Sequence, residues 1–130
     1  MTIRVTQRAD ATATVVQVDG ELDMDSAPML RAVLDDALDR GDVHLVLDAA
    51  RLRFCDSVGL SVLLTTHFAS EARGGYLRVA NPTDQLLHLL SVVGLAQHVI
   101  CFHSVEAAVS DDRQQAIVYV PHPLDAPPER

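Results

Sequence analysis

Short apolar runs alternate along the chain with longer segments whose apolar residues recur every three or four positions. The first run covers residues 14–19, where β-branched side chains predominate, and it predicts a strand. The apolar residues that follow Ser26 have helical spacing, so we predict an amphipathic helix that Ser26 caps and Gly41 ends. The apolar positions of this helix are Leu30, Val33, Leu34, Ala37 and Leu38.

The same alternation continues toward the C-terminus. Residues 44–47 predict a strand covered on both faces, and residues 49–56 are predicted to connect it to a second helix that ends at Gly74-Gly75. That helix has apolar residues at Leu60, Leu63, Leu64, Phe68 and Ala72. The remaining predicted elements are a strand at 76–80, a helix ending at Gly94, a strand at 99–102 and a helix at 105–109. Asn81 is predicted to cap the helix that ends at Gly94, with Pro82 at its first position, and Ser104 to cap the last helix.

This repeated order of strand and helix predicts an α/β fold, in which helices cover a mostly parallel sheet of four or five strands. The chain has 130 residues, which suits one domain over residues 1–110. From Asp111 the sequence becomes polar and rich in proline, so residues 111–130 are predicted to form a mobile tail. Residues 116–120 are an apolar exception, which fits either an added edge strand or docking on the body or a partner.

Composition restricts the chemistry that the chain can perform. All ten basic residues are arginine, so a P-loop lysine, a Schiff-base lysine and a Ser-x-x-Lys pair are excluded. The net charge of −8 repels a phosphate backbone, and we therefore expect no nucleic-acid partner. Aromatic residues make up only 4 % of the chain, so the core must be aliphatic.

Compartment and ligand signals point to a small cytoplasmic protein. Residues 1–14 lack the apolar segment of a secretory signal, and no apolar run is long enough for membrane insertion. Cys55 and Cys101 lie in apolar surroundings and are predicted to be buried thiols rather than a disulfide. No histidine or cysteine spacing suits a metal site, so we expect no metal and no cofactor. For a compact acidic domain we expect a monomer.

The segment at residues 54–60 carries the candidate functional site, because it leads from a loop into the second helix. Either Asp56 or Ser57 caps this helix, which places the Ser57 hydroxyl beside unpaired backbone N–H groups. Gly59 lets another backbone or a bulky ligand approach. A phosphate on Ser57 would be tolerated by the helix N-terminus, yet it would add about −1.5 to −2 charges beside Asp56, and near the acidic loop at residues 21–25 if the two loops share one end of the sheet. Ordinary helix capping is the alternative interpretation of this pattern.

Several segments in order resemble a STAS domain of the anti-sigma factor antagonist type, over residues 3–110. The matching segments are residues 16–23, residues 43–48, residues 54–60 with Leu63-Leu64, and Asn81-Pro82 with residues 93–95. The resemblance implies a curved sheet with helices packed against it, in which one strand is commonly antiparallel. It also implies a bacterial regulatory protein that binds partners and is not an enzyme.

Members of this family bind a cognate anti-sigma factor, usually a serine kinase, and thereby free a sigma factor for RNA polymerase. The resemblance implies that this kinase phosphorylates Ser57, that the phosphorylated chain releases it, and that a phosphatase resets the switch. The implied partner-binding residues are Asp23, Asp25, Asp56, Ser57, Val58 and Gly59. Val58 departs from the family pattern, because many relatives have a small or polar residue there.

Two other functions remain open from the sequence. The chain is a STAS subunit of a sensory or transport complex if its apolar helix faces, rather than Ser57, make the contacts. It is a small hydrolase if Ser57 or Cys55 acts as a nucleophile, but nothing in the sequence directs a histidine toward either residue.

Overall fold

The structure is a computed structural model that describes residues 1–7, 12–94 and 98–118. Its elements are β1 (Thr2–Gln7), β2 (Thr14–Leu22), α1 (Ala27–Asp39), β3 (His44–Cys55), α2 (Ser57–Ala72), β4 (Tyr76–Ala80), α3 (Asp84–Val92), β5 (Cys101–Phe102), α4 (Val105–Ser110) and the 3₁₀ turn η1 (Arg113–Gln115). The order of the helices and strands confirms the predicted α/β class.

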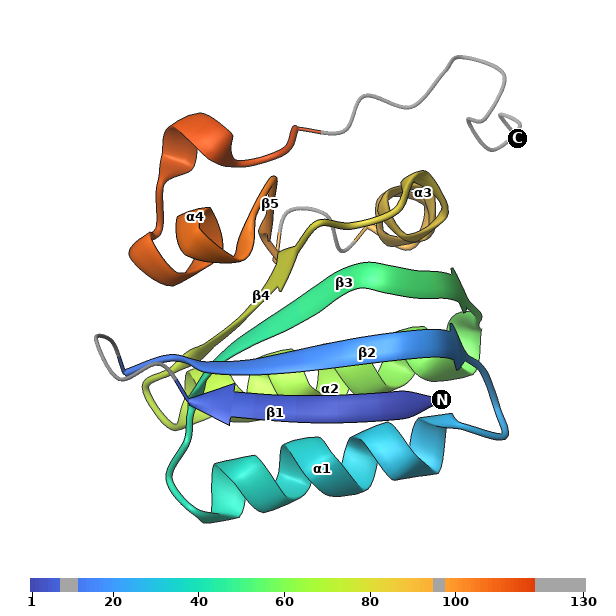
Figure 1. Cartoon of the computed structure of the whole chain (residues 1–130), viewed down its shortest axis with the longest axis horizontal. Helices are drawn as coiled ribbons and strands as arrows, with labels where there is room; N and C mark the ends of the chain where they lie inside the picture. The colour runs from blue at the N-terminus through green and yellow to red at the C-terminus, as the bar shows by residue number, and fades with distance from the viewer. Residues whose placement is uncertain (8–11, 95–97, 119–130) are drawn as a thin grey trace.

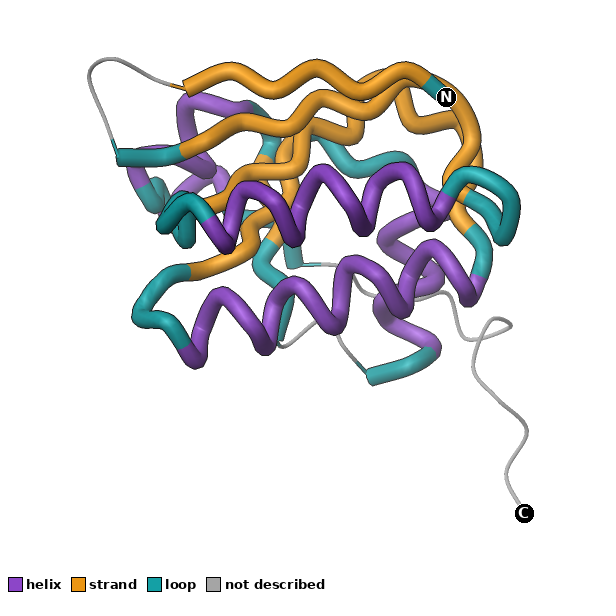
Figure 2. Tube along the Cα trace, turned by 90° about the horizontal axis from the view of Figure 1, so that it is seen from below, coloured by secondary structure: helices purple, strands orange, loops and turns teal. Residues whose placement is uncertain are grey.

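The sheet has five strands in the order β1-β2-β3-β4-β5. β1 runs antiparallel to β2, whereas each of the other neighbouring pairs is parallel. Helices α1 and α2 lie side by side beneath the sheet, and α4 lies on the opposite side (Figures 1 and 2). The mostly parallel sheet therefore follows the prediction, and the antiparallel strand agrees with the family resemblance.

The core is mostly aliphatic, as the composition predicts, although its largest fully buried side chain is Phe102, and it lies on both faces of the sheet. Leu45 and Leu47 of β3 belong to the larger cluster, to which α1, α2 and α3 contribute. Val46, which lies between them in the strand, belongs to a second cluster with Ala107 and Ala108 of α4. Successive side chains of a strand point to opposite faces, so this short apolar run is buried from both sides.

The predictions missed β1 and the second half of β3. Five of the six residues of β1 are exposed, so this edge strand has no apolar alternation that a sequence pattern would reveal. β3 continues to Cys55, although residues 49–56 were predicted as a connection. Register shifts between β2 and β3 at residues 17–19 and 20–21 interrupt the alternation of side chains, which explains why the pattern did not indicate a strand.

One predicted helix cap was wrong, and a second occupies the predicted position without the expected bond. Asn81 does not cap α3; it adopts a left-handed backbone with φ of 53°, and its side-chain nitrogen donates to Asp48 Oδ1 at 3.1 Å. Thr83 is the cap, and its hydroxyl accepts from the Leu86 N–H at 3.2 Å. Ser26 is the N-cap residue of α1, as predicted, but its hydroxyl bonds back to the preceding segment, donating to the Glu21 carbonyl at 2.7 Å and accepting from the Asp23 N–H at 3.0 Å.

The chain beyond Ser110 is partly attached to the body. Ala116 forms an antiparallel bridge with Phe102, and the Ile117 N–H donates to the Cys101 carbonyl at 2.8 Å. For residues 116–118 these contacts favour the predicted alternative of pairing at the sheet edge. Residues 119–130, the rest of the segment predicted as a tail, lie outside the described residues.

Candidate functional site

The N-terminus of α2 is capped by Asp56, which resolves the alternative that the sequence left open. Asp56 has an extended backbone, and its Oδ1 accepts from the Gly59 N–H at 2.8 Å. Ser57 is therefore the first residue of the helix, and it is exposed. Its hydroxyl stands at the surface, beside a helix end that carries partial positive charge.

Asp56 also joins this helix end to the loop between β2 and α1. Its Oδ2 accepts from the Met24 N–H at 3.2 Å, and its own N–H donates to the Leu22 carbonyl at 3.0 Å. Because β2 and β3 are parallel, the loops that follow them lie at the same end of the sheet, on the right in Figure 1. The two loops therefore share one end of the sheet, which is the condition the sequence analysis set for placing the acidic loop near Ser57, and the contact runs through Asp56, the residue before Ser57.

Gly59 is buried and permits a close approach between α2 and β2. A Cβ at this position would lie 2.5 Å from Leu22 Cγ and 2.8 Å from the Leu22 carbonyl oxygen. The residue that approaches Gly59 is thus Leu22 of the same chain. Gly59 sets the position of the helix, and Ser57 and Val58 are the exposed residues of this turn.

The side chain of Asp23 stabilises the acidic loop through hydrogen bonds to the loop's own backbone. Asp23 Oδ1 accepts from the N–H groups of Ser26 and Asp25, each at 3.0 Å. These bonds, the one from Ser26 first, hold the pKa of Asp23 below its usual range. The Asp23 carboxylate is therefore engaged with its own loop, whereas Asp25 is exposed.

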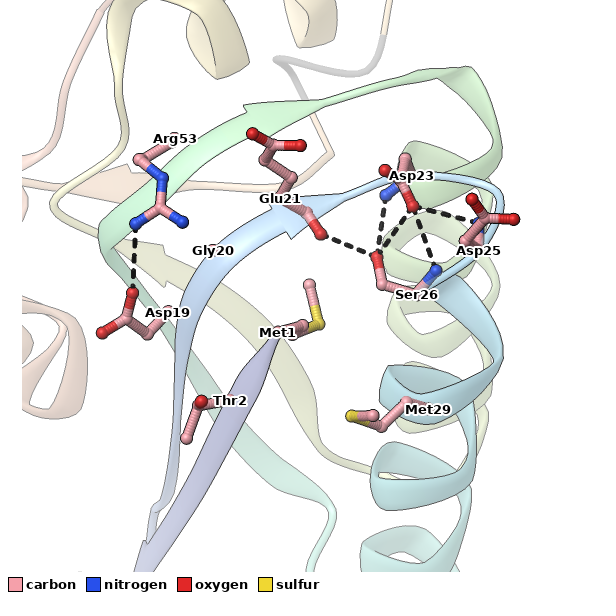
Figure 3. A pocket seen from close by; sticks show the side chains of 10 residues that line it. All are labelled: Met1, Thr2, Asp19, Gly20, Glu21, Asp23, Asp25, Ser26, Met29 and Arg53. Carbon is pink, nitrogen blue, oxygen red and sulfur yellow. Dashed lines mark hydrogen bonds and ion pairs between the residues drawn. The ribbon is translucent and has the colours of Figure 1, made fainter.

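A cavity of about 630 Å³ opens on the other side of the acidic loop (Figure 3). Carboxylates of Asp19, Glu21 and Asp25 line it together with Met29 and the guanidinium of Arg53. The Nη1 atom of Arg53 lies 3.4 Å from Asp19 Oδ1. Asp56 and Ser57 are not among the residues that line this cavity, so the cavity and the Ser57 surface are neighbouring but separate features.

Three exposed large apolar residues belong to the segments that meet at the start of α2: Phe54 and Val58 flank Asp56 and Ser57 in the chain, and the Met24 N–H is bonded to Asp56. Met24, Phe54 and Val58 are 68 %, 44 % and 42 % exposed. The sequence analysis gave only Val58 a partner-binding role, because an apolar residue within an apolar pattern is normally assigned to the core. Exposed apolar groups that gather in one place are typical of protein-binding surfaces.

The sequence analysis also missed Gln85, which lies in the first turn of α3. Its Oε1 accepts from the Cys55 N–H at 3.1 Å, and its Nε2 donates to the Cys55 carbonyl at 2.7 Å. A lone glutamine thirty residues along the chain from its partner leaves no signal in the sequence, because only the fold brings the two together.

Two side chains, His67 and Cys55, bear on the hydrolase alternative. His67 lies ten residues further along α2, about 15 Å from Ser57 at the helical rise per residue. Burial, with a smaller contribution from Asp56, raises the pKa of the Cys55 thiol to about 12, so Cys55 stays protonated at neutral pH. Within the described ranges, no three histidine, cysteine or acidic residues are grouped to hold a metal ion. In the same ranges, no helix is long and apolar enough to cross a membrane.

Asp56→Ala is expected to destabilise the protein by about 2 kcal/mol, because it removes the acceptor for both the Gly59 and the Met24 N–H groups. Ser104→Ala, which removes the single capping bond of α4, is the matched control and is expected to cost about 1 kcal/mol. Urea denaturation of the two variants measures the difference. Equal costs would mean that the bond from Asp56 to the acidic loop contributes nothing.

The sequence matches a known protein family and proteins of known role. Residues 5–102 match the family described as Mlab, STAS domain. An anti-sigma F factor antagonist from Paenibacillus polymyxa is 30 % identical over 96 residues, which cover 73 % of this chain and 82 % of the relative. An anti-sigma-B factor antagonist from Bacillus subtilis is 31 % identical over 96 residues, which cover 73 % of this chain and 86 % of the relative.

Solved structures share the fold. An anti-sigma factor antagonist from Mycobacterium paratuberculosis superposes with a TM-score of 0.76 at 25 % identity, over 86 % of this chain and 93 % of that one. The anti-sigma factor antagonist SpoIIAA in its unphosphorylated form has a TM-score of 0.72 at 24 % identity, over 91 % of this chain and all of that one. The phosphorylated form of SpoIIAA, a Bacillus cell fate determinant, has a TM-score of 0.68 at 23 % identity, over 86 % of this chain and 100 % of that one.

Proposed function

The chain belongs to the STAS-domain anti-sigma factor antagonist family, and on that premise we propose that it binds a cognate anti-sigma factor serine kinase while Ser57 is unphosphorylated. Capture of the kinase frees a sigma factor, and phosphorylation of Ser57 ends the capture. The observation that carries this proposal is the exposed hydroxyl of Ser57 at the N-terminus of α2. The chain itself acts as a binding module, and the kinase performs the chemistry.

The surface around Ser57 suits a partner that dissociates when a phosphate adds negative charge to that surface. Met24, Phe54 and Val58 supply exposed apolar area in the segments next to the residue that would be modified. Partner binding removes this surface from water, and a phosphate within it would lose its hydration without gaining a counter-charge from Asp56. The phosphate therefore costs little in the free protein, where the helix end faces it, and much in the complex.

One phosphate can supply the loss of affinity that this switch requires. Moving a complex from mostly bound to mostly free takes a few kcal/mol, since about 1.4 kcal/mol changes an equilibrium tenfold. Structures of SpoIIAA in its unphosphorylated and phosphorylated forms both match the fold of this chain. That likeness supports a switch in which the fold stays the same while the surface at Ser57 changes. A separate phosphatase would then restore the unmodified form.

This function places the protein in the bacterial cytoplasm, where sigma factors and RNA polymerase act. Binding between the purified chain and each serine-kinase anti-sigma factor of the same genome tests it by calorimetry. We expect one of these kinases to bind, and the complex to dissociate after ATP is added. If the chain instead serves as a STAS subunit of a sensory or transport complex, none of the kinases binds and Ser57 substitutions leave its complexes intact.

A further inference from the structure

The end of β3, just before Ser57, has no neighbouring strand on the β4 side, and a side chain bonds to it there instead. β2 pairs with β3 as far as Cys55, whereas β4 pairs with β3 only from His44 to Asp48. The peptide groups of β3 that follow therefore have a strand neighbour on one side only. A buried peptide group without a partner is costly, and Cys55 is only 1 % exposed.

Gln85 takes the place of that missing neighbour. A primary amide carries one acceptor and one donor site at a spacing close to that of a peptide group. Gln85 uses both on one residue, because it accepts from the Cys55 N–H at 3.1 Å and donates to the Cys55 carbonyl at 2.7 Å. We infer that Gln85 is a positioning residue, which fixes the Cys55 peptide and thereby the presentation of Ser57 two residues later. This inference rests on the function proposed above.

The other contacts of the segment come from β2, the acidic loop and α2 itself. The Asp56 N–H donates to the Leu22 carbonyl, its carbonyl accepts from Leu60, and its carboxylate accepts from Gly59 and Met24. Gln85 supplies the contact from α3, and α3 is anchored in the core by the fully buried Leu86 and Leu90. Gln85 therefore connects a rigid helix to the residue that precedes the cap of α2.

This arrangement makes Ser57 responsive to the position of α3. A displacement of α3 pulls the amide away from Cys55 and leaves the segment held only by β2, the acidic loop and α2. The kinase and the binding surface both require a defined Ser57 geometry, since a mobile acceptor hydroxyl must be ordered before reaction. Gln85 thus affects both phosphorylation and binding through the Cys55 peptide.

Three variants separate the two bonds from a general loss of stability. Gln85→Leu removes both bonds at nearly constant size, whereas Gln85→Glu keeps the acceptor for the Cys55 N–H and loses the donor. Gln114→Leu makes the same change at another exposed glutamine and is the control. We expect the Cys55 amide to exchange about tenfold faster in Gln85→Leu, and less than that in Gln85→Glu, while the core amides of Val46 and Leu47 keep their rates.

Phosphorylation kinetics provide the second measurement. We expect kcat/KM for phosphorylation of Ser57 to fall about five-fold in Gln85→Leu and to be unchanged in Gln114→Leu. Unchanged exchange at Cys55 would overturn the inference, and so would faster exchange accompanied by wild-type phosphorylation. If no kinase phosphorylates even the wild-type chain, the proposed function fails, and the exchange rate alone then decides whether Gln85 holds the segment.

Discussion

Ser57→Asp is expected to weaken binding to the anti-sigma factor kinase by about two orders of magnitude, whereas Ser57→Ala is expected to bind as tightly as the wild type. The aspartate places a charge on the surface that the partner must dehydrate, to which we assign the exposed Met24, Phe54 and Val58. It also sits in the first turn of α2, where a negative charge is favourable, so the fold is retained. Calorimetry with the purified kinase measures both affinities.

Thr65→Asp is the control for this experiment. Thr65 is an exposed hydroxyl residue on the same helix, about 12 Å from Ser57, so its substitution adds the same charge outside the proposed surface. We expect Thr65→Asp to bind normally, and Ser57→Ala to stay bound after ATP is added. Equal affinities of Ser57→Asp and Ser57→Ala would contradict the switch.

Gly75→Ala is expected to destabilise the protein by about 3 kcal/mol or more, the largest effect on stability that we predict. A Cβ at this position would lie 1.9 Å from the Val43 carbonyl oxygen and 2.5 Å from the carbonyl carbon. These are backbone atoms, and the Tyr76 N–H donates to that same oxygen at 2.9 Å. Relief of the clash must therefore break the first pairing between β3 and β4.

The neighbouring glycine provides the control for this close contact. Gly74 has φ of +80°, and nothing lies within 4 Å of a Cβ built there. Gly74→Ala is thus expected to cost only the conformational strain of the left-handed backbone, about 1 kcal/mol. Urea denaturation compares the two variants. If Gly75→Ala lowers the free energy of unfolding no more than Gly74→Ala does, the close contact between Gly75 and the Val43 carbonyl group is contradicted.

The helices and buried strands could be predicted because their signals are local. Apolar spacing located α1 and α2, and glycines with positive φ, at Gly41 and Gly74, follow these helices as predicted. β1 and the end of β3 could not be found in this way. The first is an exposed edge strand, and the second depends on pairing with β2 through shifted register.

In the candidate site, too, some features have local sequence signals and others depend on the fold. The local pattern placed the helix cap at Asp56 or Ser57, the structure assigns it to Asp56, and the parallel sheet explains why the acidic loop lies beside it. The contact of Gln85 with Cys55, and the exposure of Met24 and Phe54, depend on how distant segments are placed in the fold. A local pattern contains no information about such contacts.

Location of the phosphate by mass spectrometry, after the chain is incubated with its cognate kinase and ATP, tests the central claim most directly. The account predicts a single phosphate on Ser57, and none on the exposed Thr65 or the buried Thr66. Ser57→Ala should remain unmodified under the same conditions. A phosphate at another residue, or dissociation of the complex by ATP while Ser57 stays unmodified, would contradict the account.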